Sequence, residues 1–545
     1  MSNKTDFHDE SVVDLARARV RLRSRAVKSS PESHTKELAD INLLLDKGHS
    51  VEAQSRTAKL ISEARNEPVT LAQARLALSL ALEMHGRHPE SLAAIATYET
   101  PEGRAHLPPD LALRLRVQIS VTLNYCGDHP KAIALLQAAL RELPDEDNAP
   151  AGPIYAAIAR VYRTINEYSI ARDNSRRALD CYRQSGHWRG LAEAYFGVAF
   201  ADQHEGQFES ALENFEQALK LIGDHPSTFL LGKIYSNMAG SCFFLKRPHE
   251  GVHYLQKAIG YYECTQHKGL AAIGYNNLGI NLMLLGKWDA AQEAIERALA
   301  VATEADEQAK EIPMILDSLG ELRMLRGDLD EAADYLRRAV AMANEQSNKW
   351  YSCQALRTFA RCRIAMNDSA EALTAAHQAL EVAERIADRQ AICESQLLLA
   401  ESSLQTGNLD YCATNLQAVV EQTSDSESDL GLAGEAQRLQ GLLALTRSDP
   451  TAAVQHFGRS ASIFDLLGDR YRSARAHYEL GRAYAVEQPE LAAEHLSRAV
   501  TTFRELGAKR DLELAQSKLN EHDQTEPQRD RQREAAVQLI TLRLA

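Results

Sequence analysis

The sequence predicts an all-α fold, a right-handed superhelical solenoid of about twelve helix-turn-helix repeats with helical caps. Apolar residues make up 45% of the 545 residues and aromatic residues only 6%, and the alternating apolar runs typical of strands are nearly absent. Tyrosines and alanines each recur at a forty-residue step: Tyr155, Tyr195, Tyr235 and Tyr275, then Ala178, Ala218, Ala258 and Ala298. Such a period indicates helical units that bury their apolar faces only by stacking on neighbours.

The N-terminal end, residues 1–34, is expected to be a polar tail followed by a basic flanking helix. The basic residues of this helix are Arg17, Arg19, Arg21, Arg23, Arg25 and Lys28. Helical phase spreads these charges around the helix axis, so we interpret the segment as a solvated helix that covers the first repeat. Contact between this helix and nucleic acid is the alternative.

Residues 35–508 are expected to form the repeat array, in which a turn joins the two helices of each unit. Most turn positions carry Gly or Asn, which accept the left-handed backbone found where helices end. The predicted turn residues are Gly48, Gly86, Gly127, Asn166, Gly206, Lys246, Gly286, Gly327, Asn367, Gly407, Ser448 and Gln488. Three of them, Lys246, Ser448 and Gln488, depart from this composition and are assigned from the flanking pattern.

Small side chains mark the second helix of each unit at two positions. The first row lies five residues after the turn: Ala53, Ala132, Ala171, Ala211, Gly251, Ala291, Ala332, Ala372, Cys412 and Ala453. The second row lies seven residues further on: Ala139, Ala178, Ala218, Ala258, Ala298, Ala339, Ala379 and Ala499. Both rows share one helical face, so helices can approach closely there, while larger residues such as Phe215 and Phe457 fill the grooves.

This pattern resembles the tetratricopeptide repeat, most clearly in Tyr275, Leu278, Gly279, Gly286, Ala291, Ile295 and Ala298. The period of about forty residues exceeds the usual thirty-four. Long-period arrays of this family form sensor parts of bacterial transcription activators and cargo-binding parts of adaptors, and the chain is similar to them. Three charged residues, Asp202, Arg323 and Arg363, occupy inner positions where apolar residues are usual, which leaves the helix phase of their repeats open.

After the array, residues 509–521 are expected to form a capping helix and residues 522–533 a charged linker. Residues 534–545 read as an amphipathic helix with an apolar stripe made of Ala536, Val537, Ile540 and Leu544. Because this pattern runs to the last residue without a stop signal, we expect either that the chain is the repeat portion of a longer protein or that this helix docks on a partner.

Composition and motifs exclude several classes of function. The net charge of −14 argues against the array as a general phosphate binder. The eight cysteines include no CxxC pair and no metal-ligand spacing, and no apolar run could span a bilayer, so a cytoplasmic protein without metal or cofactor is expected. Phosphate loops, dinucleotide fingerprints, HExxH and GxSxG motifs are all missing. We therefore predict that the protein is not an enzyme.

The resemblance implies that the first helix of each pair lines a concave groove. The family's groove positions fall on Arg160, Phe196, Phe200, Ser236, Asn237, Asn276, Asn277, Asp317, Ser318, Arg357 and Arg361. The amides of Asn237 and Asn277 can donate to and accept from a peptide backbone, and the arginines can bind carboxylates in bidentate fashion. The alternatives are helix-to-helix hydrogen bonding by the two asparagines and simple solvation of the arginines.

The leading functional hypothesis is a scaffold or regulatory module that binds a peptide or protein partner in this groove. The alternative is the sensor portion of a bacterial signalling or transcription regulator, whose effector domain follows Ala545 or acts in trans. The genomic sequence beyond that codon discriminates between them. The partner's identity and the oligomeric state are left open.

Overall fold

The computed structural model describes residues 31–522, except 145–148, 224, 226, 266, 307, 424–429 and 486. Most of the predicted N-terminal tail and basic helix, the linker after residue 522 and the C-terminal amphipathic helix lie outside the described residues. The described part consists of α-helices joined by short turns, with two short 3₁₀ helices and no strand. The predicted all-α repeat fold is confirmed.

The chain divides into two compact units. Unit 1 comprises Met1–Ile234 with Cys264–Gln266, and unit 2 comprises Tyr235–Glu263 with His267–Ala545, so the boundary falls inside one helix. The helices of unit 1 are α2 (Pro31–Asp46), α3 (Ser50–Glu63), α4 (Pro68–Met84), α5 (His88–Ile95), η1 (Ala96–Tyr98), α6 (Pro101–Arg104), α7 (Pro109–Tyr125), α8 (His129–Arg141), η2 (Ala149–Ala151), α9 (Gly152–Thr164), α10 (Tyr168–Ser185), α11 (Trp188–His204) and α12 (Phe208–Ile222).

The helix shared by the two units is α13 (Thr228–Phe244). Unit 2 continues with α14 (Pro248–Cys264), α15 (Lys268–Leu284), α16 (Trp288–Ala305), α17 (Ile312–Arg326), α18 (Leu329–Glu345), α19 (Lys349–Ala365), α20 (Ser369–Arg385), α21 (Arg389–Gln405), α22 (Leu409–Thr423), α23 (Leu430–Thr446), α24 (Pro450–Leu467), α25 (Arg470–Tyr484) and α26 (Pro489–Leu506). Residues 509–522 are also helical.

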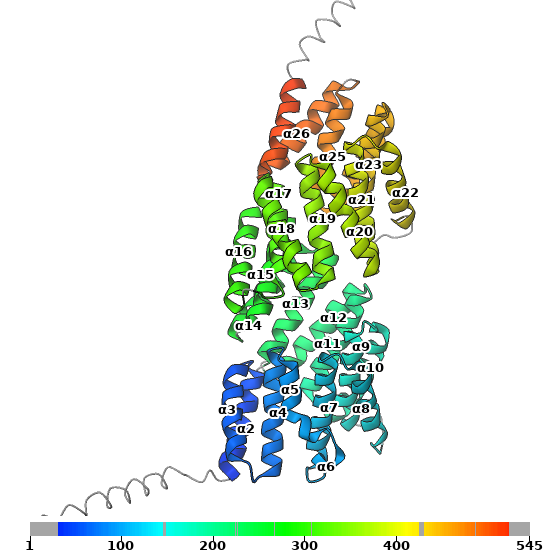
Figure 1. Ribbon diagram of the computed structural model, residues 1–545. Coiled ribbons are helices and arrows are strands. Elements are labelled where there is room, and N and C mark those ends of the chain that lie inside the picture. Colours follow the sequence, from blue (N-terminus) through cyan, green and yellow to red (C-terminus); the bar gives the residue numbers. More distant parts are fainter. Residues whose placement is uncertain are drawn as a thin grey trace, which may run out of the picture. The chain divides into compact units, whose positions relative to one another are not determined.

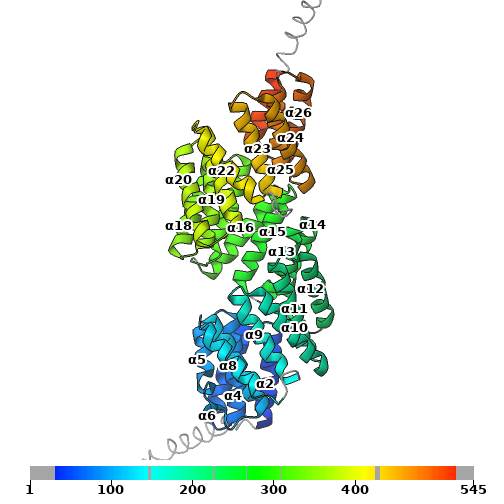
Figure 2. The same cartoon turned by 90° about the vertical axis from the view of Figure 1, so that its right-hand side faces the viewer.

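Consecutive helices pair as antiparallel hairpins, as Figure 1 shows for α2 with α3 and for α4 with α5. Each first helix also contacts the next first helix: α4, α7, α9 and α11 follow one another in unit 1, and α15, α17, α19, α21 and α23 do so in unit 2. In Figure 2, α9 and α11 can be followed beside the second helix α10. The first helices of each unit therefore form a continuous layer.

The predicted turns have the expected backbone at eleven of twelve positions within the described residues. Their φ values are positive, from +58° at Lys246 to +93° at Gly327. Lys246 and Ser448 adopt this conformation without being Gly or Asn, at a cost of about 1–2 kcal/mol each. Gln488 differs, because with φ of −136° it precedes α26 as its N-cap.

The two predicted rows of small residues lie at the helix contacts. Every residue of the first row is buried, and the alanines of the second row are at most 2% exposed. Large residues lie between them, as predicted: Phe457 is 0% exposed. Its ring carbons would stand only 2.5 Å from a Cβ atom added to Gly441, so the ring requires a glycine on the neighbouring helix.

The three charged inner residues keep the helix phase, because the following second helix supplies partners. Asp202 is 1% exposed and accepts hydrogen bonds from Ser210 Oγ at 2.8 Å and Asn214 Nδ2 at 3.2 Å. Arg363 pairs with Glu371 at 2.7 Å. Charge at this position thus ties the two helices of one hairpin together.

Contacts distant in sequence bring the ends of each unit together. In unit 1, Asp46 at the end of α2 pairs with Arg189 at the start of α11. In unit 2, the rings of Trp288 and Tyr471 lie 6.0 Å apart, and Tyr471 donates to Asp511 Oδ2 at 2.9 Å. Within each unit, helices that are far apart in the sequence therefore meet. Among the described helices, none combines the length and apolar content needed to cross a bilayer.

Candidate functional site

The concave side of each layer of first helices is called here the inner wall of its unit. Side chains on it reach toward one another from different hairpins. In unit 2, Arg472 of α25 interacts electrostatically with Arg361 of α19 and Glu321 of α17. In unit 1, Arg160 of α9 pairs with Glu83 of α4 at 3.3 Å.

The inner wall of unit 2 carries ion pairs between successive first helices. Arg361 of α19 pairs with Glu321 of α17 at 3.1 Å, and Arg357 of α19 pairs with Glu394 of α21. The sequence predicted Arg357 and Arg361 as binders of a partner's carboxylates. In the structure, glutamates of the neighbouring repeats already occupy both guanidinium groups, so these two arginines hold first helices together.

Arg438 of α23 is the most buried member of this set, with 3% exposure. Its Nη2 lies 2.7 Å from Glu401 of α21 and its Nε lies 2.8 Å from Glu435. Arg472 and Arg475 of α25 also approach Glu435, at 3.5 and 4.0 Å. Burial alone would raise the pKa of Glu435, but the three arginines outweigh it and hold this pKa at about 2.

The other predicted groove residues of unit 2 differ in exposure. Asn276, Asp317 and Ser318 are buried, at 0%, 2% and 4% exposure, because the neighbouring first helices cover them. This differs from the open groove position predicted for them. Both amide atoms of Asn276 and Oδ1 of Asp317 have no hydrogen-bond partner among the described residues.

The remaining three predicted residues of unit 2, Ser236, Asn237 and Asn277, are half-buried. Ser236 is hydrogen-bonded to Tyr262, a buried residue of α14. The backbone carbonyl of Asn277 accepts a hydrogen bond from Asn281 Nδ2 at 2.9 Å, and the side-chain amide of Asn277 takes no part in that bond. Asn237 and Asn277 therefore keep the partial exposure that partner contact requires.

Asp317 yields a prediction about stability. Burial, followed by repulsion from Glu321, raises its pKa to about 6, while Oδ2 accepts from Gln354 Nε2 at 2.8 Å. A folded-state pKa above the unfolded value of 3.8 means that ionised Asp317 destabilises the fold above about pH 6 and that this penalty fades as the pH falls. Asp317→Asn, which keeps the acceptor, should raise the melting temperature near neutral pH and change it little near about pH 4. Equal shifts at both pH values would contradict this assignment.

The predicted residues of unit 1 lie on two successive first helices, α9 and α11. Phe196 and Phe200 of α11 have ring centroids 6.1 Å apart, and Arg160 lies on the preceding first helix. Phe196 is 6% exposed and packs on Phe215 at 5.7 Å, so it belongs mainly to the core. Phe200 is half-buried and keeps part of its ring on the surface.

Two inner-wall cations of unit 1 were not predicted. The Arg163 guanidinium lies 5.4 Å from the Phe200 ring centroid and 5.8 Å from that of Phe196. Lys233 Nζ, from α13, lies 4.9 Å from the Phe196 centroid. Arg163 stands three residues before the turn residue Asn166, outside the family's groove positions, which explains why the resemblance missed it.

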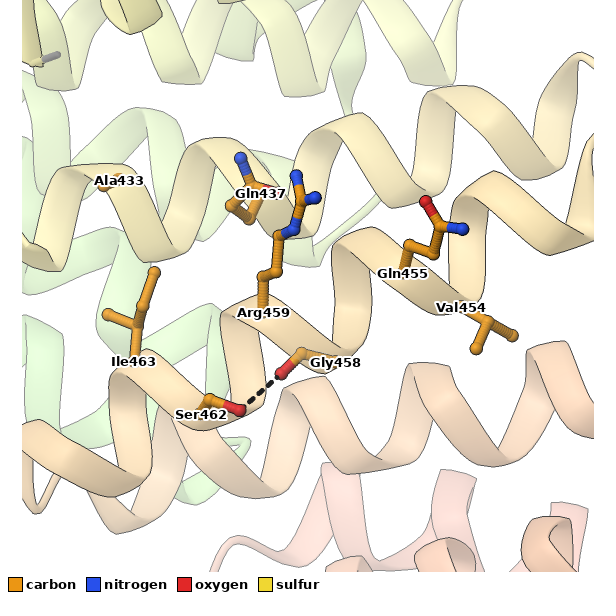
Figure 3. A pocket seen from close by; sticks show the side chains of 8 residues that line it. All are labelled: Ala433, Gln437, Val454, Gln455, Gly458, Arg459, Ser462 and Ile463. Carbon is orange, nitrogen blue, oxygen red and sulfur yellow. Dashed lines mark hydrogen bonds between the residues drawn. The ribbon is translucent and has the colours of Figure 1, made fainter.

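A hollow on unit 2 lies between α23 and α24. Figure 3 shows Arg459 of α24 next to Gln437 of α23, with Ile463 at one end of the hollow. Ser462 Oγ donates to the carbonyl of Gly458 at 2.9 Å. None of the predicted groove residues lines this hollow. Among the described residues, no group of three His, Cys, Asp or Glu side chains could hold a metal ion.

The paired helices, left-handed turns and small-residue contacts define an all-α helical repeat protein. Residues 270–345 and 311–385 match the tetratricopeptide repeat family. No curated protein matches the sequence.

Solved structures with a similar fold include a Rap protein complexed with competence and sporulation factor, at 15% identity and a TM-score of 0.46 over 71% of this chain and 100% of that chain. The apo quorum sensor NprR from B. thuringiensis is 14% identical, with a TM-score of 0.46 over 64% and 99% of the two chains. The Cut9–Hcn1 hetero-tetramer is 14% identical, with a TM-score of 0.44 over 89% and 96%.

Proposed function

We propose that this protein is a non-catalytic interaction scaffold that binds a peptide or protein partner along the inner walls of its units. One observation carries the proposal. On unit 1, Arg163 and Phe200 come from successive first helices, lie against each other and are half-buried, so part of each remains available to a partner. Cationic and aromatic side chains combine charge recognition with a large apolar contact area.

Binding of this kind depends on a preformed surface. The helices hold the inner-wall side chains in place before a partner arrives, so the entropy cost of association falls mainly on the partner. An extended peptide or an amphipathic helix could contact several repeats at once, each through a few side chains. On unit 2, the partly exposed amides of Asn237 and Asn277 are proposed as a second set of contacts.

A selection from random peptides tests the proposal directly. A peptide library displayed on phage is selected on the immobilised full chain, and enriched peptides are synthesised and titrated by calorimetry. We expect saturable binding with one peptide per chain. Failure to enrich any sequence over a surface without protein would contradict the proposed function.

The same peptides test the asparagine pair. Asn237→Ala combined with Asn277→Ala should lower the affinity for some of these peptides about 10-fold, because two polar contacts are lost. The melting temperature of the protein should stay nearly unchanged. Gln256→Ala, which removes an exposed amide from the second helix α14, is the matched control and should leave affinity unchanged. Unaltered binding of every peptide to the double variant would remove the asparagines from the site.

A further inference from the structure

A group of cations on the inner wall of unit 1 surrounds two aromatic rings. Arg160 and Arg163 come from α9 and Lys233 from α13, while the rings of Phe196 and Phe200 belong to α11. These five residues are named here the cation cluster. Phe196 lies within 6 Å of both Arg163 and Lys233, so charges from two different helices converge on a single ring.

Two carboxylates near the cluster pair with arginines other than Arg163. Glu83 of α4 pairs with Arg160 at 3.3 Å and also accepts from Gln118 Nε2 at 2.6 Å. Glu193 of α11 pairs with Arg189 Nε at 3.2 Å. The two acids nearest the cluster thus each hold an arginine.

Arg163 is left without such a partner. Among the described residues, no carboxylate oxygen lies within 4.0 Å of its guanidinium nitrogens, and the guanidinium lies against the rings of Phe196 and Phe200. Arg163 therefore differs from Arg357, Arg361 and Arg438 of unit 2, each of which holds a glutamate.

The electrostatic consequence is repulsion among the cations. Burial, then Arg160, lowers the pKa of Arg163 to about 10. Burial, then Arg160 and Arg163, lowers the pKa of Lys233 to about 8, although Glu193 and Glu83 act in the opposite direction. A negative group placed between Arg163 and Lys233 would relieve this repulsion and would form charge-assisted hydrogen bonds.

We propose that the cation cluster binds an acidic peptide segment, in which a carboxylate reaches Arg163 and Lys233 and a neighbouring apolar side chain lies on Phe200. The half-buried ring of Phe200 supplies the apolar contact and the adjacent guanidinium the charge. This inference rests on the proposed function and names the chemistry of the partner that binds the inner wall of unit 1.

Extended polyanions fit the cluster less well than a peptide does. Nucleic-acid bases stack on aromatic rings, but Arg163 and Lys233 already lie against the ring of Phe196. The net charge of −14 also repels a long phosphate backbone or an anionic bilayer, whereas a short segment brings few charges close to the rest of the surface.

The test uses peptides selected on the full chain. Peptides rich in Asp and Glu beside an aromatic or aliphatic residue should be enriched, and Arg163→Gln should weaken their calorimetric affinity about 10- to 100-fold. Arg163→Lys should retain most of the affinity, and amide versions of the peptide, with Gln for Glu, should bind weakly. Arg176→Gln, the same charge change at an exposed position of α10, should bind like the unaltered chain.

Each outcome bears on the inference. Circular dichroism confirms that Arg163→Gln is folded, and Lys233→Gln serves as a second variant if it is not. If peptides bind but are not acidic, or bind Arg163→Gln and Lys233→Gln as tightly as the unaltered chain, the inference fails while the proposed function stands. If no peptide is enriched, both fail. Tighter binding of oligonucleotides or phosphatidylserine vesicles than of acidic peptides would also overturn it.

The pH dependence supplies a second readout. Lys233 faces Arg160 and Arg163 of α9, Glu193 of α11 and Glu83 of α4, and its pKa is about 8. A bound carboxylate raises this pKa, so affinity should be highest below about pH 8 and should fall as the pH rises past it. In Lys233→Gln this fall should disappear. A fall of the same size in that variant would remove Lys233 from the site.

Discussion

Replacing Phe457 by alanine is expected to destabilise the hairpins around α24 by about 3–5 kcal/mol. The ring is 0% exposed and packs in the core cluster with Ala453, Ala476 and Leu480. Its removal leaves a cavity beside Gly441, whose missing side chain makes room for the ring. Hydrogen exchange of α23, α24 and α25 measures the local loss, since repeats of an array need not unfold together.

Two further variants make this expectation specific. Leu466→Ala, at a site 76% exposed on the same helix, should change stability by less than about 0.5 kcal/mol. Gly441→Ala should cost about 1–3 kcal/mol alone, because its Cβ would lie 2.5 Å from the Phe457 ring. The double variant should be less destabilised than the sum, since the new methyl group fills part of the cavity. Strict additivity would contradict the packing described here.

Replacing Arg438 by methionine is expected to destabilise α21 and α23 by about 3 kcal/mol, because it leaves two partly buried glutamates without their main partner. This loss of stability is at the low end of the range for breaking a buried ion pair, since Arg472 and Arg475 remain near Glu435. Hydrogen exchange of the two helices checks it. Arg337→Met, which removes an exposed pair with Asp334, should cost less than about 0.5 kcal/mol.

The pH dependence of the protein's stability gives a second test of the interaction between Glu435 and its arginines. Because the folded pKa of Glu435 is about 2 and lies below the unfolded value of 4.5, its ionised form stabilises the fold above about pH 4.5, and this contribution disappears as the pH falls toward 2. Adding Glu401→Gln and Glu435→Gln to Arg438→Met should recover part of the stability. Equal losses in Arg438→Met and Arg337→Met would contradict a structural role for the buried arginine.

Local features of the fold were predictable from the sequence. Turn residues such as Gly127 and Asn367, and small residues such as Ala332, are set by backbone conformation and by close approach within one hairpin. The division into two units was not predictable. It depends on curvature accumulated over several repeats, which a pair such as Asp46 with Arg189 reveals only in three dimensions.

The candidate site was predicted only in part. Family positions selected Phe200 and Arg160, which lie on successive first helices, but could not show which charges are already neutralised. One signal was present in the sequence: Glu321 and Arg361 occupy equivalent positions of neighbouring repeats, where opposite charges favour pairing. Arg163 could not be found this way, because its distinguishing feature is the lack of a carboxylate nearby.

Photo-crosslinking tests the central claim, that partners bind to the inner wall, most directly. A benzophenone amino acid is placed at Phe200 on the inner wall or, as the control, at Arg176 on the second helix α10. With a selected acidic peptide, we expect a crosslink from the position of Phe200, and excess unlabelled peptide should abolish it. We expect no crosslink from the position of Arg176. A crosslink from the position of Arg176 and none from that of Phe200 would contradict it.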